Sequence, residues 1–356
     1  MKEINFILKI ILLPFSLLYG LGVSIRNVFY DTGILKASKF SIPIISVGNL
    51  SIGGAGKTPH IEYLIELLRP YINLGTMSRG YKRKTKGYLD VRPNHNALEA
   101  GDEPLQFKLK YPDIAVAVAE SRAIGIPYMV ADHPDIQLIL LDDAFQHRSV
   151  RPDLNILLTQ FEKPYTRDQL LPMGRLRETP IAAERADIII VTKCPEYLSE
   201  SQRESMQTEI NPLNHQKVYF TKYEYQDIYS IYNPNSTLKI TKSLNVILLS
   251  AIANTDYLFD YLENQVHDIK EIEYEDHHVF TRNDVEYIEK VYKNWEVENL
   301  IILTTEKDAI RLAMFKEQLE EKQLPIFVLP IKVSFLDDEK NNFDHQIKEF
   351  LLNYQS

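Results

Sequence analysis

The feature that most constrains the fold is a glycine-rich turn between an apolar run and an amphipathic stretch. Residues 42–47, IPIISV, form the apolar run, and residues 51–58 read Ser-Ile-Gly-Gly-Ala-Gly-Lys-Thr. Four apolar residues then recur at helical spacing: Ile61, Leu64, Ile65 and Leu68. A strand, a glycine-rich loop and a helix in this order are typical of phosphate-binding loops, in which backbone N–H groups surround nucleotide phosphates. The turn therefore predicts an α/β fold that binds a nucleotide.

The turn follows the Walker A pattern, Gly-x4-Gly-Lys-Ser/Thr, with one departure. Gly56-Lys57-Thr58 fit the pattern, but Ser51 stands at the position of its first glycine. We expect Lys57 to bridge the β- and γ-phosphates, and we expect the Thr58 hydroxyl to bind Mg²⁺. The residues predicted to bind the nucleotide are those of the whole turn: Ser51, Ile52, Gly53, Gly54, Ala55, Gly56, Lys57 and Thr58.

A second apolar run ends in two carboxylates. Residues 136–141, IQLILL, are followed by Asp142 and Asp143. Such a pair at the end of a strand can be a helix N-cap with a solvated neighbour. Beside a phosphate-binding loop it reads as a Walker B motif, in which one aspartate holds Mg²⁺ directly or through water. We therefore predict that Asp142 and Asp143 are metal-binding residues.

Further apolar runs show no alternation, which is typical of strands buried on both faces of a parallel sheet. They are residues 114–119, 154–158 and 187–192. Residues 221–244 differ, because they alternate in polarity and contain an Asn-Pro-Asn-Ser turn. A second α/β pattern starts at residue 245. We predict a hydrophobic membrane-associating helix over 1–30, a P-loop domain over 31–220, a two-stranded connector over 221–244 and a smaller C-terminal α/β domain over 245–356.

The N-terminal segment 4–25 is strongly apolar, with Lys9 as its only charged residue. Its uninterrupted part, from Ile10 to Ile25, is shorter than the ~20 residues of a perpendicular membrane span. The favoured interpretation is a helix docked into one leaflet from the cytosolic side. A spanning helix, a cleaved signal peptide and a buried core helix remain alternatives.

Charge and cysteine content exclude several classes of function. The chain has 40 Lys and Arg against 49 Asp and Glu, a net charge of −9, which argues against general nucleic-acid binding. The single cysteine, Cys194, excludes an internal disulfide and a cysteine-rich zinc site. Residues 79–86 nevertheless form a basic segment, which suits an anionic headgroup or a phosphorylated substrate, with a solvated hairpin as the alternative. Further candidates for phosphate binding are Arg122, Arg148, Arg151, Arg175 and Arg177.

Two other short motifs carry groups suited to proton transfer. Gly101-Asp102-Glu103-Pro104 places two carboxylates on a turn before a probable helix. A kinase needs a carboxylate to orient or deprotonate the acceptor hydroxyl, although Asp102 can equally serve as a helix N-cap. Asp276-His277-His278 invites a zinc interpretation, but no Cys/His framework accompanies it. His277 is therefore either a plain loop residue or part of a site between domains.

Taken together, the motifs resemble the tetraacyldisaccharide 4′-kinase family, whose members also have Ser or Thr at the position of Ser51. The resemblance spans residues 47 to 308. The matching segments are Val47-Gly48-Asn49-Leu50-Ser51-Ile52-Gly53-Gly54-Ala55-Gly56-Lys57-Thr58-Pro59, Ser78-Arg79-Gly80-Tyr81, Gly101-Asp102-Glu103-Pro104, Leu141-Asp142-Asp143-Ala144-Phe145-Gln146-His147, Gly174-Arg175-Leu176-Arg177-Glu178, Arg185-Ala186-Asp187, Asp276-His277-His278 and Thr305-Glu306-Lys307-Asp308.

The resemblance implies an ATP- and Mg²⁺-dependent lipid kinase. It implies transfer of the γ-phosphate to the 4′-hydroxyl of a tetraacylated glucosamine disaccharide 1-phosphate, which gives lipid IVA in lipid A biosynthesis. The implied fold is a P-loop NTPase domain with a parallel sheet, a second, smaller α/β domain and an N-terminal hydrophobic helix. The implied location is the cytosolic face of the inner membrane. The expected partners are the acylated substrate and the lipid surface, without nucleic acid, and we expect a monomer.

The resemblance also assigns residues to roles. The catalytic residues it implies are Lys57, Asp102 as the base and His277 as a cleft histidine. The metal-binding residues it implies are Thr58, Asp142, Asp143 and Glu178. The substrate-binding residues it implies are Tyr81, Arg83, Glu103, Arg122, Gln146, His147 and Arg177.

Two other classes of P-loop protein remain open from the residues alone. One is a nucleotide switch or metal-chaperone NTPase, for which Thr192-Lys193 is the only hint of a base-reading loop. The other is a ligase acting on a small soluble carboxylate, which would leave the apolar N-terminus unexplained. Nucleotide preference tests the first class, and membrane association tests the second.

Overall fold

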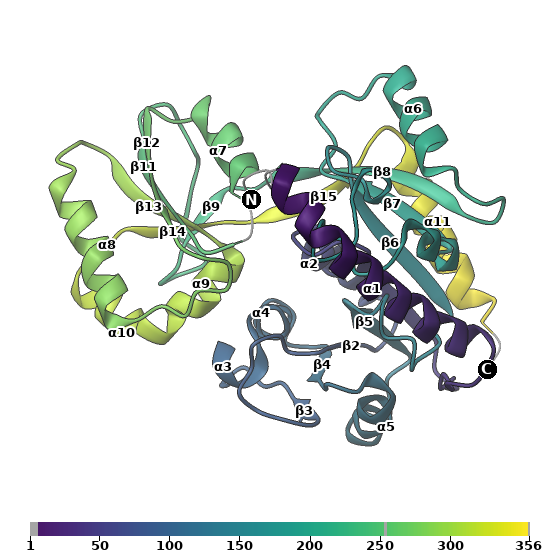
Figure 1. Cartoon of the computed structure of the whole chain (residues 1–356). Coiled ribbons are helices and arrows are strands. Elements are labelled where there is room, and N and C mark those ends of the chain that lie inside the picture. Colours follow the sequence, from purple (N-terminus) through teal and green to yellow (C-terminus); the bar gives the residue numbers. More distant parts are fainter. Residues whose placement is uncertain (1–5, 253–254, 355–356) are drawn as a thin grey trace.

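The computed structural model describes residues 6–252 and 255–354, so that Ala253 and Asn254 and both chain ends lie outside the described residues. The chain forms two α/β domains, each built on one sheet, with a long N-terminal helix against the larger domain (Figure 1). The mixed α/β architecture with mostly parallel sheets confirms the predicted fold class.

The larger sheet has nine strands in the order β15-β8-β7-β6-β1-β5-β2-β4-β3. From β8 to β4 the strands run parallel, and β15 and β3 are antiparallel edges. The strands are β1 (Ile44–Asn49), β2 (Leu74–Ser78), β3 (Leu89–Asp90), β4 (Ala115–Val118), β5 (Leu138–Asp142), β6 (Leu154–Gln160), β7 (Ile188–Thr192), β8 (Lys217–Tyr225) and β15 (Ile331–Phe335). The helices of this domain are α2 (Lys57–Leu68), α3 (Ala97–Ala100), α4 (Asp102–Lys110), α5 (Arg122–Asp132), α6 (Glu200–Ile210) and α11 (Glu339–Leu352).

Apolar side chains cover both faces of this sheet, which is why its strands lack alternation. On one face Ile45 and Val47 of β1 pack with Ile61 and Leu64 of α2. On the other face Ile44 packs with residues of β5 and α5. The apolar runs that predicted strands therefore coincide with β1, β4, β5, β6 and β7.

The smaller sheet has six strands in the order β10-β9-β14-β13-β11-β12, of which β14, β13, β11 and β12 are parallel. The strands are β9 (Ile228–Ser230), β10 (Thr237–Leu238), β11 (Asn245–Ser250), β12 (Asp268–Glu273), β13 (Leu300–Thr305) and β14 (Ile326–Leu329). Its helices are α7 (Asp256–Glu263), α8 (Arg282–Asn294), α9 (Glu306–Leu312) and α10 (Lys316–Glu321). The second α/β unit therefore exists as expected.

The domain division differs from the predicted one at both ends of the smaller domain. Residues 221–244 are not a separate connector, because β8 belongs to the larger sheet, and β9 and β10 belong to the smaller one. Residues 331–352 are not part of the smaller domain, because β15 pairs with β8 and α11 follows it there. The physical reason is apolar burial: Phe335 of β15 packs against Tyr63 of α2 and Phe343 of α11.

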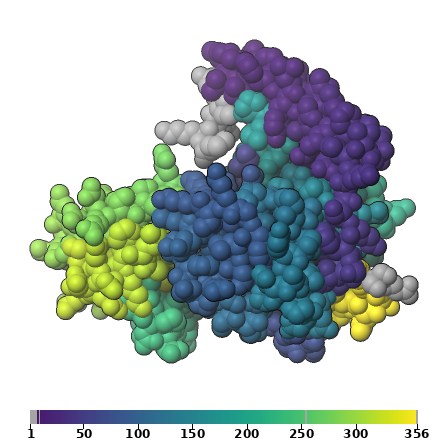
Figure 2. Space-filling model, turned by 90° about the horizontal axis from the view of Figure 1, so that it is seen from below, coloured from purple at the N-terminus to yellow at the C-terminus, as the bar shows by residue number. Residues whose placement is uncertain are grey.

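Helix α1 (Phe6–Asp31) lies along the outside of the larger domain (Figures 1 and 2). Its inward side is partly polar, because Ser16 donates to the carbonyl of Leu171 at 3.1 Å and Tyr19 donates to that of Arg177 at 3.0 Å. Gly20 permits the close approach, since a Cβ there would meet Leu170 at 2.6 Å. The outward side is apolar and exposed, with Leu17 65% and Leu18 67% exposed. A surface helix of a water-soluble domain has the opposite arrangement, with its apolar side inward and its polar side toward solvent.

Candidate active site

The glycine-rich turn connects β1 to α2, as the sequence predicted. Gly53 (φ 116°) and Gly56 (φ 88°) adopt left-handed backbone conformations that favour glycine. Neighbouring strands fix the turn, because Gln160 donates to the carbonyl of Gly54 at 3.1 Å and Thr192 donates to that of Ala55 at 3.0 Å. The turn therefore has the strand–loop–helix geometry of a phosphate-binding loop.

Lys57 lies at the carboxyl edge of the larger sheet, among groups from β1, β5 and the 168–178 loop. Its Nζ donates to Asn49 Oδ1 at 3.1 Å and lies 3.5 Å from Asp143 Oδ1. Arg177 donates to Asp143 Oδ1 at 2.8 Å and to Asn49 Oδ1 at 2.8 Å. Parallel strands meet at this edge, and a nucleotide-binding crevice is expected there. The structure thus brings together three residues that the sequence assigned to phosphate, metal and substrate.

The two aspartates at the end of β5 differ in their surroundings. Asp142 is buried, and its Oδ1 has no hydrogen-bond partner among the described residues. Burial, with the negative charges of Glu103 and Asp143, raises the pKa of Asp142 to about 7 against the opposing Lys57 and Arg122. Burial alone would also raise the pKa of Asp143, but Lys57 and Arg177 outweigh it and hold that pKa well below its usual range.

These aspartates fit a magnesium ion that binds together with a nucleotide. Within 6–252 and 255–354, no group of three or more His, Cys, Asp and Glu side chains could hold a metal. Mg²⁺ in kinases is held by one or two carboxylates together with phosphate oxygens. The unpartnered Asp142 Oδ1, beside Asp143, is a donor of the required kind.

Arg122 and His147 lie next to Asp142 on the same edge. Arg122 is buried, donates to the backbone carbonyl of Asp142 at 3.2 Å, and has an Nε with no partner among the residues described. His147 Nε2 lies 3.5 Å from Arg122 Nη1. Burial and the nearby Arg122 charge lower the pKa of His147 to about 4. Gln146 donates to the carbonyl of Asn49 at 2.9 Å. Arg122 is therefore a buried cation with donor capacity left for an anion.

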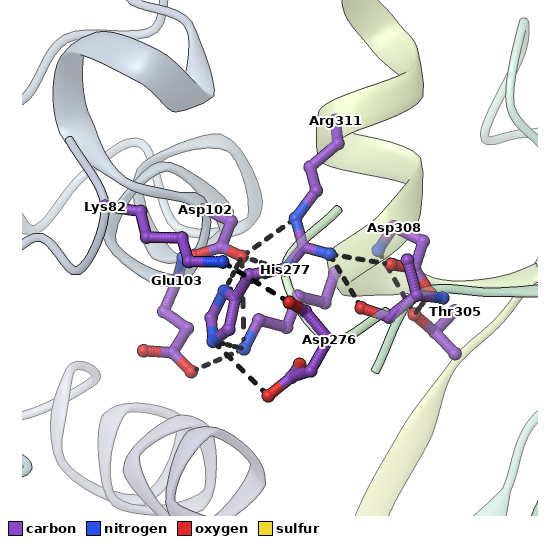
Figure 3. A network of polar contacts seen from close by, with 10 residues as sticks. Lys82, Asp102, Glu103, Asp276, His277, Thr305, Asp308 and Arg311 are labelled. Atoms are coloured by element: carbon purple, nitrogen blue, oxygen red, sulfur yellow. Dashed lines mark hydrogen bonds and ion pairs between the residues drawn. The ribbon is translucent and has the colours of Figure 1, made fainter. Parts of the chain in front are cut away.

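A second polar cluster joins the two domains at the start of α4 (Figure 3). Asp102 is buried, and its Oδ1 accepts from the backbone N–H of Glu103 at 3.1 Å. From the smaller domain, His277 Nδ1 lies 3.2 Å from Asp102 Oδ2, and Arg311 Nε donates to the same oxygen at 3.0 Å. The fold thus pairs Asp102 and His277, which are 175 residues apart in the sequence.

The electrostatics of this cluster keep Asp102 ionised. Burial on its own raises the pKa of Asp102. The hydrogen bond with His277 and the positive charges of Lys307 and Arg311 outweigh burial and hold that pKa well below its usual range. Asp102 is therefore a carboxylate at neutral pH, as a proton acceptor must be.

The basic segment reaches the same cluster through one residue pair. The Tyr81 ring lies 4.8 Å from the His277 ring, and Lys82 donates to the carbonyl of Asp276 at 3.4 Å. Arg83 instead forms an ion pair with Glu120 at 2.7 Å. The structure therefore places Tyr81 beside His277, whereas the Arg83 guanidinium is paired with the Glu120 carboxylate.

Comparison with known proteins supplies the relationship that the geometry alone does not. The family model for tetraacyldisaccharide-1-P 4′-kinase matches residues 8–352. The chain belongs to this family. It is 43% identical over 351 residues to the tetraacyldisaccharide 4′-kinase of Flavobacterium psychrophilum, covering 98% of each chain. It is 40% identical over 345 residues to that of Phocaeicola vulgatus, covering 96% of this chain and 94% of the relative.

A solved structure of the family has the same overall fold. The crystal structure of the "apo" form of LpxK from Aquifex aeolicus in complex with ATP is 30% identical in sequence. Its TM-score is 0.73, with 97% of this chain and 99% of that chain covered. The 4′-kinase family therefore includes both the larger and the smaller domain of this chain.

Glu178, which the sequence assigned to the metal, is bound by side chains of the protein in this structure. Glu178 is completely buried, and its oxygens accept from Arg26 at 3.2 Å, Asn27 at 3.0 Å and Arg185 at 2.8 Å. Its charge is neutralised by arginines, and two of its partners belong to α1. Glu178 therefore fastens α1 to the larger domain, and its assignment to the metal stays a prediction.

His60, in the first turn of α2, contacts the phosphate-binding loop and was not indicated by the motif. Its Nδ1 lies 2.7 Å from the carbonyl of Gly56, and its Nε2 lies 3.1 Å from Thr221 Oγ1. Burial lowers the pKa of His60 to about 4, so the ring is neutral. A neutral ring that donates from Nδ1 fixes the Gly56 carbonyl. Its place one turn after Gly56 is the signal that could have identified it.

Lowering the pH should destabilise the fold through His60. In the unfolded chain His60 binds a proton below about pH 6.5, whereas in the folded chain it does so only near the pKa of about 4. The contribution to stability is complete above pH 6.5 and is lost as the pH falls toward 4. At pH 5 the loss amounts to about 2 kcal/mol. Urea unfolding at pH 7 and pH 5 should show a smaller pH difference in His60→Gln than in the parent, and equal differences would contradict this assignment.

Proposed function

We propose that this chain is an ATP-dependent kinase that phosphorylates the 4′-hydroxyl of a tetraacyldisaccharide 1-phosphate and so forms lipid IVA. The observation that carries the proposal is the family relationship over residues 8–352 together with a phosphate-binding loop. The two polar clusters act on one another, since the charge of Glu103, beside Asp102, helps to raise the pKa of Asp142.

The larger domain holds ATP. The backbone of residues 51–58 surrounds the phosphates, and Lys57 stabilises the charge that builds up on the γ-phosphoryl group. Thr58, Asp142 and Asp143 are the residues that would hold Mg²⁺, which when bound neutralises phosphate charge. In this structure Lys57 already lies between Asn49 and Asp143, at the end of the strands where the γ-phosphate is expected.

Asp102 receives the proton of the acceptor. The 4′-oxygen forms a bond to the γ-phosphorus, and the bond from that phosphorus to the β–γ bridging oxygen breaks, which releases ADP. The proton of the hydroxyl passes to Asp102, and His277 supports the carboxylate through their 3.2 Å contact. The lowered pKa of Asp102 keeps its carboxylate ionised at neutral pH.

Cationic side chains near Asp142 and near the Asp102–His277 pair suit a substrate that carries its own phosphate. The buried Arg122 Nε has no partner among the described residues, and Lys82 of the basic segment donates to the carbonyl of Asp276. We infer that these groups bind the 1-phosphate or the transferring phosphoryl group. The remaining residues proposed for the substrate are Tyr81, Arg83, Glu103, Gln146, His147 and Arg177.

Helix α1 is proposed to hold the enzyme at the lipid surface. It is long and apolar enough to cross a membrane. Only 11% of the residues in its most apolar 18-residue stretch are buried inside the protein, so it is not a core helix. The polar contacts of Ser16, Tyr19 and Asn27 with the larger domain favour a helix that lies in the interface rather than one that crosses the bilayer. An acylated substrate would then meet the enzyme in the plane of the membrane.

Charges placed on the exposed side of α1 should detach the protein from lipid. Leu17→Asp with Leu18→Asp should lower binding to phosphatidylglycerol-containing vesicles by about 100-fold or more, because two apolar side chains lose their burial in lipid. Co-sedimentation measures the binding. Leu352→Asp is a matched control, since Leu352 is 85% exposed on α11. Vesicle binding within twofold of the parent protein would contradict the assignment.

Acceptor-dependent release of ADP tests the proposed function. Purified protein with Mg·ATP should release ADP in detergent micelles only when the tetraacyldisaccharide 1-phosphate is present. GTP should be a much poorer donor. Equal turnover without the acceptor, or a strong preference for GTP, would instead favour a nucleotide switch.

A further inference from the structure

Helix α9 of the smaller domain carries four buried or mostly buried charged residues at the domain junction, Glu306, Lys307, Asp308 and Arg311. The last three form one connected group with Asp102. Lys307 and Asp308 belong to a family motif to which no role has been attached. Burying ion pairs costs desolvation energy that largely offsets their attraction, so such a group is a weak source of stability. Its arrangement therefore calls for another physical reason.

Arg311 uses its whole guanidinium group at the junction (Figure 3). Nε and Nη2 both donate to Asp102 Oδ2 of the larger domain. Nη1 donates to Asp308 Oδ1 at 3.0 Å and to the carbonyl of Ala251 at 2.9 Å. A planar donor held on both sides has one available orientation, and it transmits that orientation to the carboxylate it binds.

Asp308 holds Arg311 in place. It is completely buried, and its Oδ2 accepts from the backbone N–H of Ala251 at 3.1 Å and from Thr305 Oγ1 at 2.8 Å. Both oxygens of Asp308 are therefore engaged within the smaller domain. The chain of contacts runs from the ends of β11 and β13 through Asp308 and Arg311 to Asp102.

Lys307 acts on the other two members of the cluster. Its Nζ donates to Glu103 Oε1 at 3.0 Å and lies 3.4 Å from His277 Nε2. Arg311 Nη2 lies 3.1 Å from His277 Nδ1, which is the ring nitrogen that faces Asp102. Lys307 and Arg311 therefore contact the His277 ring at both of its nitrogens, beside Asp102.

We propose that Arg311, held by Asp308, and Lys307 are positioning residues that orient the Asp102–His277 pair toward the acceptor hydroxyl. This inference rests on the proposed function, in which Asp102 accepts the proton. It means that the proton acceptor is set in place only when the smaller domain is docked against α4.

The charged groups facing Asp102 also predict a change in the pH dependence of turnover. They are Glu103 on its own helix, Lys82 beside the Asp276 carbonyl, Asp276 and His277 in the 276–278 loop, and Lys307, Asp308 and Arg311 on α9. Arg311 is the cation in closest contact with Asp102 Oδ2. Without it, Asp102 becomes protonated at higher pH, and the acidic limb of the kcat profile moves upward.

The test compares full-length Arg311→Ala, Arg311→Lys and Asp308→Asn with the parent enzyme in acceptor micelles. We expect Arg311→Ala to lose about 100-fold in kcat, with the KM for ATP within threefold and the acidic limb raised by about one pH unit or more. Guanidinium chloride at millimolar concentration should restore part of that kcat but should restore none in Asp102→Asn. Arg311→Lys should lie between Arg311→Ala and the parent, and Asp308→Asn should lose less than Arg311→Ala.

Glu306→Gln is the matched control, because Glu306 pairs with Lys110 at 2.9 Å across the same junction without touching Asp102. It should leave the pH profile and the guanidinium response of the parent unchanged. If Arg311→Ala does not fold, the kcat, the pH profile and the guanidinium response of Arg311→Lys and Asp308→Asn are compared with those of the parent instead. An active parent with an unshifted profile and no rescue in these variants would overturn the inference. A parent enzyme that phosphorylates no acceptor would instead overturn the proposed function.

Discussion

Replacing Lys57 by alanine should lower kcat for phosphoryl transfer by about 1,000-fold and should weaken ATP binding as well. Lys57 is the cation of the phosphate-binding loop, and it lies beside the carboxylate of Asp143 and the amide of Asn49. Loss of this charge removes the group that meets the γ-phosphoryl oxygens as negative charge builds up on them. Single-turnover phosphate transfer measures the chemical step, and equilibrium binding of ATP measures the affinity.

The Lys57→Ala protein should remain folded, because Asp143 keeps its ion pair with Arg177 at 2.8 Å. A melting temperature close to that of the parent enzyme checks this. Lys57→Arg is a second comparison, since it keeps the charge but changes the shape of the donor, and it should recover only part of the activity. Turnover within threefold of the parent in Lys57→Ala would show that the loop does not hold the reacting phosphate.

Replacing Asp102 by asparagine should lower kcat by about 100- to 10,000-fold, the usual contribution of a positioned base. The shape of the side chain is kept, so the bond from the Glu103 N–H to its oxygen can persist. ATP affinity should change little, because the phosphate-binding loop is in β1–α2. Measuring kcat and the Kd for ATP in the same preparation separates these two effects.

Asp113→Asn is the control for Asp102→Asn. Asp113 is an exposed carboxylate of the larger domain that pairs with Arg69 at 3.3 Å on the surface. An exposed pair of this kind contributes little to stability, and its loss should leave kcat unchanged. If Asp102→Asn retained parental turnover, the proton of the acceptor would have to leave by another path.

Local patterns were sufficient to predict that the glycine-rich turn and the Asp142–Asp143 pair lie at one edge of the sheet. The apolar run before Ser51, the glycines and the Asp142–Asp143 pair each report a strand end, and parallel strand ends meet at one edge. The edges of the domains could not be predicted in this way. Strand β15 follows β14 directly in the chain, but it pairs with β8, and its Phe335 packs against Tyr63 and Phe343 of the larger domain.

The part of the site around Asp102 depends on contacts between residues far apart in the chain, which a local sequence pattern does not predict. Asp102 could be recognised as a candidate from its turn, but its contact with Arg311 joins residues 209 apart. The partners of Glu178 could not be predicted for the same reason, because two of them, Arg26 and Asn27, lie on α1, more than 150 residues away in the chain. Whether a carboxylate meets a metal or an arginine depends on the tertiary fold.

The most direct test of the central claim is the position of the transferred phosphate. Full-length enzyme, Mg·ATP and the tetraacyldisaccharide 1-phosphate should give a product heavier by one phosphoryl group in mass spectrometry, and phosphorus NMR should place that group on the 4′-oxygen. The product should be absent with Lys57→Ala and with an acceptor that lacks the 4′-hydroxyl. Transfer to another hydroxyl, or ATP consumption without a phosphorylated lipid, would contradict the account.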